Sequence, residues 1–193
     1  RLLDAAHTRA APSGSAAASR AARMQRTGIF KAVMVLALVS AAIWWLRSAN
    51  FFGPVERLGV VGAGFMGSGI AVTAAIQAGL PVRMRDADLA GVGRGIHAVS
   101  DVVCDRVRRR SATPLEGDRH RSLVSGTTDY SGFRYADVVI EAVFEDLAVK
   151  QAVLREVEAV TGDACIFASN TSTIPIGRIA EASQRPEAVV GMH

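Results

Sequence analysis

The sequence predicts an α/β domain with a doubly wound parallel sheet over residues 51–193. Three observations predict it: short apolar runs alternate with helix-like segments from residue 57 onward, a glycine-rich loop follows the first run, and an acidic residue ends the second. Parallel strands need crossover connections, and helices between the strands supply them. Helices are therefore expected on both faces of one sheet.

The expected strands are short runs of apolar, often β-branched, residues. They cover residues 57–64, 81–86, 122–130 (with a turn), 136–143, 164–169 and 188–193. The expected helices lie between them, at residues 65–79, 89–110, 145–160 and 174–183. Apolar residues recur at helical spacing in 145–160. Gly79 is a natural end for the first helix, because glycine adopts the left-handed conformation without strain.

The loop between the first strand and the first helix is GAGFMG, a G-x-G-x-x-G pattern. Gly62 permits the tight turn, Gly64 lets the backbone approach a pyrophosphate, and Gly67 permits close packing of helix on strand. The helix that begins here presents free N–H groups and the positive end of its dipole to the phosphates. We predict a dinucleotide site rather than a merely structural turn.

Asp86 ends the second strand, 19 residues after the glycine loop. A carboxylate at this place can accept the hydrogen bonds of an adenosine ribose, and its charge would repel a 2′-phosphate. Ala87 and Asp88 offer no cation there, so the sequence favours NAD over NADP. Arg83 and Arg85 belong to the same strand and weaken that preference.

Two further strand ends carry polar side chains. Glu141 and Glu145 lie around the end of a central strand, and SNTST, residues 169–173, follows another. The carboxyl edge of a parallel sheet is where such folds bind ligands. We expect Asp146 only to begin the next helix, where an acid suits the dipole, and one residue of 169–173 to cap the helix after Pro175. Five polar residues exceed what one cap requires, so a polar ligand is expected nearby.

The first fifty residues form a separate region. Residues 1–26 are rich in Ala, Arg and Ser and cannot bury a core, so we expect disorder there. Residues 32–46 form an uncharged apolar run that is shorter than the roughly 20 residues usually needed to span a bilayer. Three interpretations stay open: membrane contact through residues 29–46, a targeting segment that starts at Met24, and a linker helix or spurious extension.

The charge is divided unevenly along the chain. Residues 1–50 contain seven Lys/Arg and one acid, whereas residues 51–193 contain 15 Lys/Arg and 17 Asp/Glu. The part expected to fold therefore lacks the charge signature of a nucleic-acid-binding protein. Cys104 and Cys165 have neither a metal-site spacing nor a disulfide framework, which favours a reducing, intracellular compartment.

Four stretches, in this order and spacing, resemble the NAD-binding domain of L-3-hydroxyacyl-CoA dehydrogenase: VVGAGFMGSGI, EAVFEDLAVK, IFASNTSTIPI and RPEAVVGMH. With LVSGTTDYSGFRYADVVIEAVFED, the similarity is to the version within multifunctional fatty-acid oxidation proteins, the bacterial complex α subunits and the mitochondrial trifunctional α subunit. It covers about residues 46–193. It implies a Rossmann-type fold, NAD as cofactor, a role in fatty-acid β-oxidation, and a place in the bacterial cytoplasm or the mitochondrial matrix.

The resemblance also implies roles for single residues. The positions similar to cofactor-binding ones are Gly62, Gly64, Phe65, Met66, Gly67, Asp86, Val143, Phe144, Glu145, Lys150, Asn170 and Ser172. Ser172 would also hold the 3-oxygen of the 3-hydroxyacyl-CoA substrate. His193 matches the catalytic histidine, which would take the proton of the 3-hydroxyl as hydride leaves for the nicotinamide.

The family pattern continues beyond this chain. An acidic residue that orients the histidine, an asparagine that helps to bind substrate, and a C-terminal helical domain would all follow His193. In the family that domain completes the acyl-CoA cleft and the dimer or multienzyme complex. We therefore expect the fragment to be inactive by itself.

Two other function classes remain open. Another Rossmann dehydrogenase, of the β-hydroxyacid or nucleotide-sugar type, would use a lysine or cysteine from the missing half and not His193. A non-catalytic, membrane-tethered NAD-binding module would result if residues 29–46 insert into a bilayer.

Overall fold

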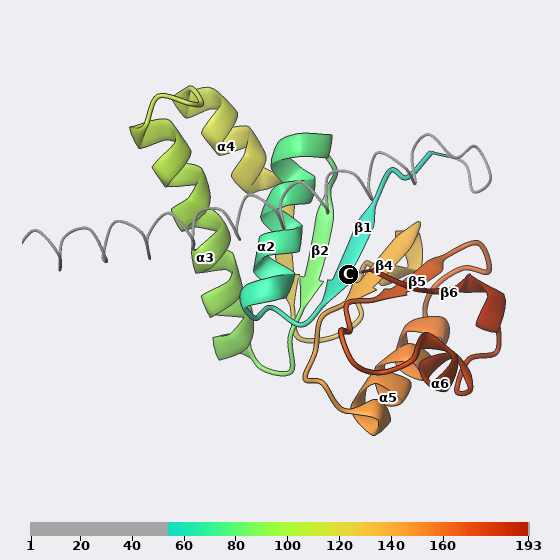
Figure 1. Cartoon of the computed structure of the whole chain (residues 1–193). Coiled ribbons are helices and arrows are strands. Elements are labelled where there is room, and N and C mark those ends of the chain that lie inside the picture. Colours follow the sequence, from blue (N-terminus) through green and yellow to red (C-terminus); the bar gives the residue numbers. More distant parts are fainter. Residues whose placement is uncertain (1–53, 193) are drawn as a thin grey trace, which may run out of the picture. The chain divides into compact units, whose positions relative to one another are not determined.

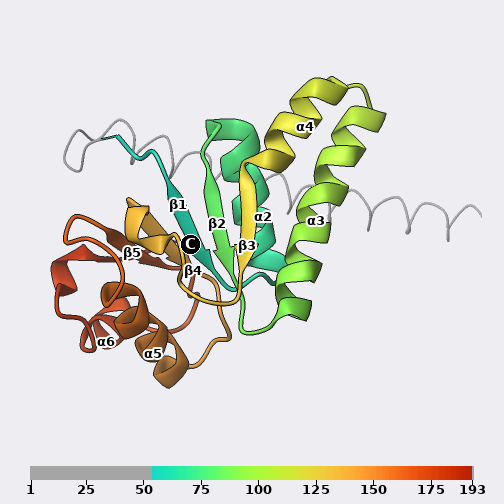
Figure 2. The same ribbon diagram turned by 180° about the vertical axis from the view of Figure 1, so that it is seen from behind.

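A six-stranded parallel sheet lies between two layers of helices (Figures 1 and 2). The computed structural model describes residues 54–192, so the predicted apolar segment and His193 lie outside the described residues. The strand order is β3-β2-β1-β4-β5-β6, so the direction of winding reverses between β1 and β4. This is the Rossmann arrangement, and the predicted fold class is confirmed. In the described part of the chain, no helix has the length and apolar character needed to cross a membrane.

Every predicted strand and helix is present. The strands are β1 (Leu58–Val61), β2 (Val82–Arg85), β3 (Val124–Thr127), β4 (Val138–Glu141), β5 (Ile166–Ser169) and β6 (Val189–Gly191). The helices are α2 (Phe65–Thr73), α3 (Leu89–Arg108), α4 (Pro114–Ser122), α5 (Leu147–Glu158) and α6 (Ile176–Ala180). A π-helical turn, η1 (Ala74–Ala78), extends α2, and 3-10 turns occupy η2 (Phe133–Tyr135) and η3 (Pro186–Ala188). The predicted stop at Gly79 is confirmed, because this residue is left-handed with φ of 64°.

Both faces of the central strands are buried. Helices α2 and α3 cover one face and α5 and α6 the other (Figures 1 and 2). Val60 and Ile140 belong to the core under α2 and α3, whereas Val61 and Val139 belong to the core under α5. Strands covered on both sides are expected to be continuous apolar runs, and this is why their sequences do not alternate.

Helix α4 was not predicted, because it has no apolar stripe. Its start is nevertheless specified locally by a capping box: the Thr113 hydroxyl accepts from the Glu116 N–H, and the Glu116 carboxylate accepts from the Thr113 N–H. Pro114 stands at the first helical position, where its fixed φ is favourable. Gly117, buried beneath Val107 of α3, lets the two helices pack closely.

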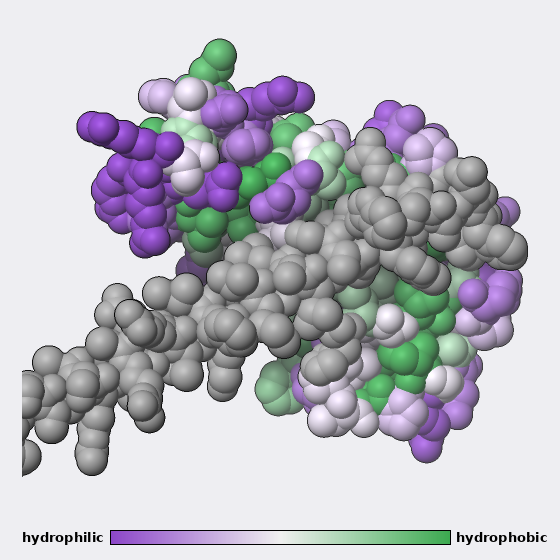
Figure 3. Space-filling model, turned by 45° about the horizontal axis from the view of Figure 1, so that its top comes forward, coloured by the Kyte–Doolittle hydropathy of each residue, from purple (hydrophilic) through white to green (hydrophobic). Residues whose placement is uncertain are grey.

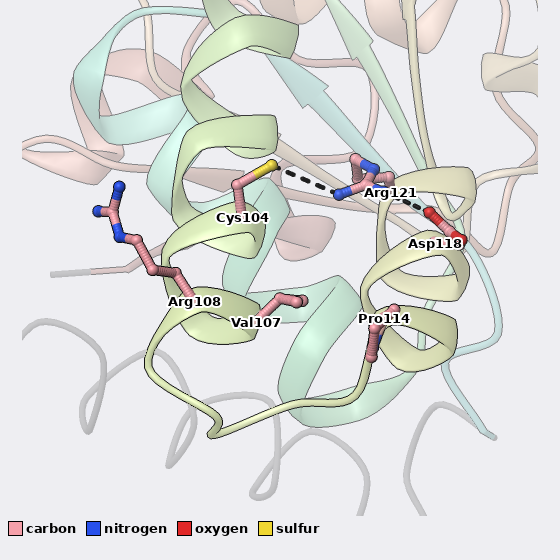
Figure 4. A pocket seen from close by; sticks show the side chains of 6 residues that line it. All are labelled: Cys104, Val107, Arg108, Pro114, Asp118 and Arg121. Atoms are coloured by element: carbon pink, nitrogen blue, oxygen red, sulfur yellow. Dashed lines mark hydrogen bonds and ion pairs between the residues drawn. The ribbon is translucent and has the colours of Figure 1, made fainter.

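The hairpin of α3 and α4 has a hydrophilic end (Figure 3). Arg108 and Arg109 pair there with Asp105 of their own helix. Between the helices lies a groove of about 340 Å³, where the Arg121 guanidinium donates to the Cys104 thiol sulfur at 3.5 Å (Figure 4). None of the residues that line this groove belongs to a strand end, so it is separate from the site described below.

Candidate functional site

The glycine loop lies where the strand order reverses, between the ends of β1 and β4. Gly62 has φ of 99°, and a Cβ atom there would lie 2.5 Å from the Ala142 carbonyl oxygen. A Cβ atom on Gly67 would lie 1.7 Å from the Gly62 carbonyl oxygen. Both positions therefore admit only glycine in this backbone. A Cβ atom on Gly64 would meet nothing within 4 Å, so the backbone here is open to an approaching ligand.

The first turn of α2 is free of side-chain caps. Its N-cap residue, Gly64, has no side chain to bind the helix N–H groups, and no acidic residue lies in the first turn. The Ser68 hydroxyl donates back to the Gly64 carbonyl at 2.8 Å. A helix start of this kind is suited to bind an anion. Phe65 and Met66, both predicted cofactor contacts, belong to this turn, and Phe65 is 90% exposed.

Asp86 is held firmly at the end of β2. Its Oδ2 accepts from the Ala63 N–H at 2.8 Å and its Oδ1 accepts from the Ala87 N–H at 2.6 Å. A carboxylate oxygen can accept more than one hydrogen bond, so both atoms can still receive ribose hydroxyls. The backbone bond to Ala63 joins this acid directly to the glycine loop.

Two site residues escaped the sequence analysis, namely Gly91 and Gly95 on α3. A Cβ atom on Gly91 would lie 2.7 Å from the Asp86 carboxyl carbon, and one on Gly95 would lie 2.7 Å from the Ala63 Cβ. These glycines let α3 pack directly against the glycine loop and against Asp86. Their spacing of four residues inside a predicted helix, which places both on one face, was the signal that could have revealed them.

Gly95→Ala should weaken NADH binding at least about tenfold and lower the free energy of unfolding by about 1–3 kcal/mol, because the methyl group pushes α3 from the loop. Gly93→Ala is the matched control: a Cβ atom there meets nothing within 4 Å, and the gain in helix propensity should stabilise the protein slightly. NADH fluorescence titration and urea unfolding of the full chain measure both effects. Equal behaviour of the two variants would contradict this account.

Arg83 and Arg85 are both engaged by the loop after β3. The Arg83 Nε donates to the Ser131 carbonyl at 2.9 Å. The Arg85 guanidinium lies over the Tyr130 ring, 4.7 Å from its centroid. Both guanidinium groups are thus bound to the loop after β3. A 2′-phosphate would have to compete with these contacts to pair with either arginine.

Asp86→Asn should raise the affinity for NADPH relative to that for NADH about tenfold, since it removes the repelling charge and keeps an acceptor for the Ala63 N–H. Titration of the full chain with each reduced cofactor measures the ratio. Asp101→Asn, on the exposed side of α3, should leave it unchanged. An unchanged ratio in Asp86→Asn would show that this residue does not determine the choice between NAD and NADP.

A buried ion pair joins the end of β4 to α5. The side chains of Glu141 and Lys150 are both 0% exposed, and their Oε1 and Nζ atoms lie 2.8 Å apart. The Val143 N–H donates to the same carboxylate at 2.8 Å, and the Ser169 hydroxyl does so at 2.6 Å. Glu141 thus ties together the ends of β4 and β5 and the first turns of α5.

Glu145 extends this network towards the surface. Its Oε2 lies 3.2 Å from Lys150 Nζ, and its Oε1 accepts from the hydroxyls of Thr171 and Thr173. The Thr171 hydroxyl is the main cause that lowers the pKa of Glu145 to about 2; burial opposes the shift, and Thr173 and Lys150 assist it. The side chain remains 37% exposed, so this carboxylate faces the open edge of the sheet.

Three of the five polar residues 169–173 serve this network rather than a helix cap: Ser169 binds Glu141, and Thr171 and Thr173 bind Glu145. The N-cap of α6 is Pro175, which makes no side-chain cap bond, so the predicted cap was wrong. Thr171 instead accepts from the Ile174 N–H at 3.1 Å while it binds Glu145. Asp146 begins α5 as predicted: it is the N-cap residue, and its carboxylate accepts from the N–H of Val149.

The remaining predicted residues lie at the same edge. The Asn170 N–H donates to the Glu141 carbonyl at 2.8 Å, which holds the start of the polar segment beside β4. Ser172 is exposed in this segment, and Phe144 is 80% exposed after β4. The structure therefore gathers the predicted positions along one strand edge, while their contacts with a cofactor stay predictions.

The depressed pKa of Glu145 predicts a specific acid dependence. Its ordinary value is 4.5, so between pH 4.5 and about 2 this group is ionised when folded and protonated when unfolded. The stability that it contributes is complete above pH 4.5 and is lost as pH falls through this window. In Glu145→Gln the free energy of unfolding should therefore decrease less steeply as the pH falls through this window. Urea unfolding of the full chain at a series of pH values measures this slope. An unaltered slope, matching that of the control Glu56→Gln, would contradict the prediction.

The chemistry of these residues suits the successive parts of a dinucleotide. The uncapped helix start and the open backbone at Gly64 can take a pyrophosphate, and Asp86 can take the ribose on the β2 side. The Glu145 network lies on the other side of the point where the strand order reverses, at the ends of β4 and β5. Strand ends on both sides of a reversal in strand order are where such folds bind dinucleotides.

Comparison with known proteins agrees with this geometry. The model of the 3-hydroxyacyl-CoA dehydrogenase NAD-binding domain matches residues 57–193. The crystal structure of FadB2 from M. tuberculosis is 39% identical, with a TM-score of 0.69 over 72% of this chain and 49% of that chain. The (S)-3-hydroxybutyryl-CoA dehydrogenase PaaH1 from Ralstonia eutropha is 33% identical, with a TM-score of 0.68 and the same coverage, 72% and 49%.

The dehydrogenase part of multifunctional enzyme 1 from C. elegans, 21% identical with a TM-score of 0.64, shares the fold over 72% of this chain and 31% of that chain. This chain spans about half the length of the two bacterial relatives. The family model covers the glycine loop, Asp86, the Glu145 network and the polar segment after β5. The chain therefore belongs to the 3-hydroxyacyl-CoA dehydrogenase family, of which it carries the NAD-binding domain.

Proposed function

We propose that this domain serves the oxidation of L-3-hydroxyacyl-CoA to 3-oxoacyl-CoA in fatty-acid β-oxidation, with NAD as the hydride acceptor, and that the 193-residue chain is inactive without a C-terminal domain. The NAD-dependent family assignment supports the reaction type. The substrate and the pathway are the proposed part.

The observation that carries the proposal is the pairing of β6 with β5. Gly191 lies in register with Ser169, and the Met192 N–H donates to the Ser169 carbonyl at 3.0 Å. Strand β6 therefore ends at the edge where the segment with Ser172 begins. The residue that follows Met192 in the sequence is His193, the position that resembles the catalytic histidine.

The residues would divide the chemistry as follows. NAD, when bound, supplies the acceptor for the hydride that leaves C3. The Ser172 hydroxyl would hold the 3-oxygen as it becomes a carbonyl oxygen. His193 would take the proton of the 3-hydroxyl, a task that suits a group with a pKa near neutrality.

A chimeric enzyme tests the proposal. Residues 54–193 would replace the matching half of FadB2, so that the relative supplies the C-terminal half. With acetoacetyl-CoA and NADH, loss of absorbance at 340 nm should report activity, and His193→Gln should lower kcat by about 10²–10⁴-fold. His97→Gln, an exposed histidine of α3, is the matched control and should keep full activity.

A chimera that binds NADH but leaves acetoacetyl-CoA unreduced would contradict the proposed substrate. Full activity in His193→Gln would favour a dehydrogenase of another type, whose acid or base comes from the other half.

A further inference from the structure

The strand order indicates which way a dinucleotide would lie across the carboxyl ends of the strands. Strand β1 pairs with β2 on one side and with β4 on the other. The pyrophosphate site at the start of α2 lies at this junction, and Asp86 marks the β2 side as that of the adenosine. The nicotinamide half must then extend over the ends of β4 and β5, where Glu145 and its partners lie.

The charge at that end of the site is negative. Lys150 is opposed by two carboxylates, those of Glu141 and Glu145, which leaves one negative charge in the network. The strand-end segments 142–149 and 170–177 contain no Lys or Arg. Asp146 is the other acid in these segments, and its carboxylate accepts a hydrogen bond from the Val149 N–H at the start of α5.

Glu145 is the member of this network that a ligand can reach. Its side chain is 37% exposed, whereas Glu141 and Lys150 are 0% exposed. Hydrogen bonds from Thr171 and Thr173 fix its orientation. The same bonds lower its pKa to about 2, so it is a carboxylate at neutral pH.

We infer that Glu145, fixed by Thr171, Thr173 and Lys150, shifts the relative affinity of this site from the reduced towards the oxidised nicotinamide. The oxidised ring carries a positive charge and the reduced ring carries none, while the rest of the two cofactors is the same. A fixed negative charge beside the ring therefore changes the ratio of the two affinities rather than both equally. This inference rests on NAD binding and is independent of the acyl-CoA substrate.

Calorimetric titration of the full 193-residue chain with NAD⁺, NADH and ADP-ribose tests it. In Glu145→Gln the ratio Kd(NADH)/Kd(NAD⁺) should fall by about three- to tenfold, mainly because NAD⁺ binds more weakly. Glu145→Asp keeps the charge and should keep most of the ratio. Glu56→Gln is the control. It removes an equal charge two residues before β1, at the amino ends of the strands, and should leave the ratio unchanged.

ADP-ribose, which lacks the nicotinamide, separates the possible failures. If it still binds and the ratio in Glu145→Gln equals that of the parent chain, the inference is overturned while cofactor binding stands. If Glu145→Gln does not fold, Phe144→Lys adds a positive charge at the neighbouring exposed position and must lower the same ratio; an unchanged ratio there also overturns it. If none of the three ligands binds the parent chain, both the inference and cofactor binding by this chain fail, whatever the acyl-CoA assay shows.

Discussion

Gly67→Ala is expected to abolish NADH binding and to lower the free energy of unfolding by about 3 kcal/mol or more. The added Cβ atom would lie 1.7 Å from the Gly62 carbonyl oxygen and 3.3 Å from a methyl carbon of Val60. Both contacts involve the buried strand and turn, which cannot move without displacing the loop that receives the pyrophosphate. Urea unfolding and NADH fluorescence titration of the full chain measure the two losses.

Gly69→Ala supplies the control for this change. It lies two residues further along α2, and a Cβ atom there meets nothing within 4 Å. Alanine should therefore leave cofactor binding intact and stabilise the helix by up to roughly 1 kcal/mol. NADH affinity in Gly67→Ala equal to that of the parent would show that the loop adapts, against this account.

Lys150→Met should lower the free energy of unfolding by about 3–5 kcal/mol, because it leaves the Glu141 carboxylate buried without its cation. Both side chains are 0% exposed, so water cannot replace the lost partner. Adding Glu141→Gln to Lys150→Met should recover at least about 1 kcal/mol, because a neutral amide needs no counter-charge and can still bind the Ser169 hydroxyl. Urea unfolding of the two single variants and the double variant gives the coupling energy.

Arg178→Met is the matched control for the removal of a cation. Arg178 pairs with Glu181 on α6, and both side chains are 60% exposed. Its loss should cost less than about 1 kcal/mol. A comparable cost for Lys150→Met, or strict additivity with Glu141→Gln, would mean that the buried pair contributes no more than a surface pair.

Elements with a strong local pattern were predictable from the sequence. The β-branched runs predicted all six strands, and the spacing of the glycines and of Asp86 predicted the nucleotide edge. Asp146 was correctly identified as a helix start, because an acidic cap acts through its own neighbours. Helix α4 escaped because a helix without an apolar stripe leaves no periodic signal, although its capping box of Thr113 and Glu116 was visible.

Features that join distant segments were not predictable in this way. Gly95 of α3 matters because it packs on Ala63 of the glycine loop, 32 residues earlier. Gly91 matters because it packs on the carboxylate of Asp86, which accepts from the N–H of the same Ala63. From the sequence, Arg83 and Arg85 belong to β2 beside Asp86, where they could affect the choice between NAD and NADP. Their contacts with Ser131 and Tyr130 come from a loop that follows another strand.

The fold class, the glycine loop, Asp86 and the strand ends at which we expect a ligand could be predicted, because periodicity, turn geometry and capping depend on neighbouring residues. Packing between distant segments makes Thr171 and Thr173 bind Glu145 rather than cap α6, and it buries Lys150 between two carboxylates. The physical reason is that the free energy of a charge depends on its burial and its partners, which here come from β4, α5 and the segment after β5.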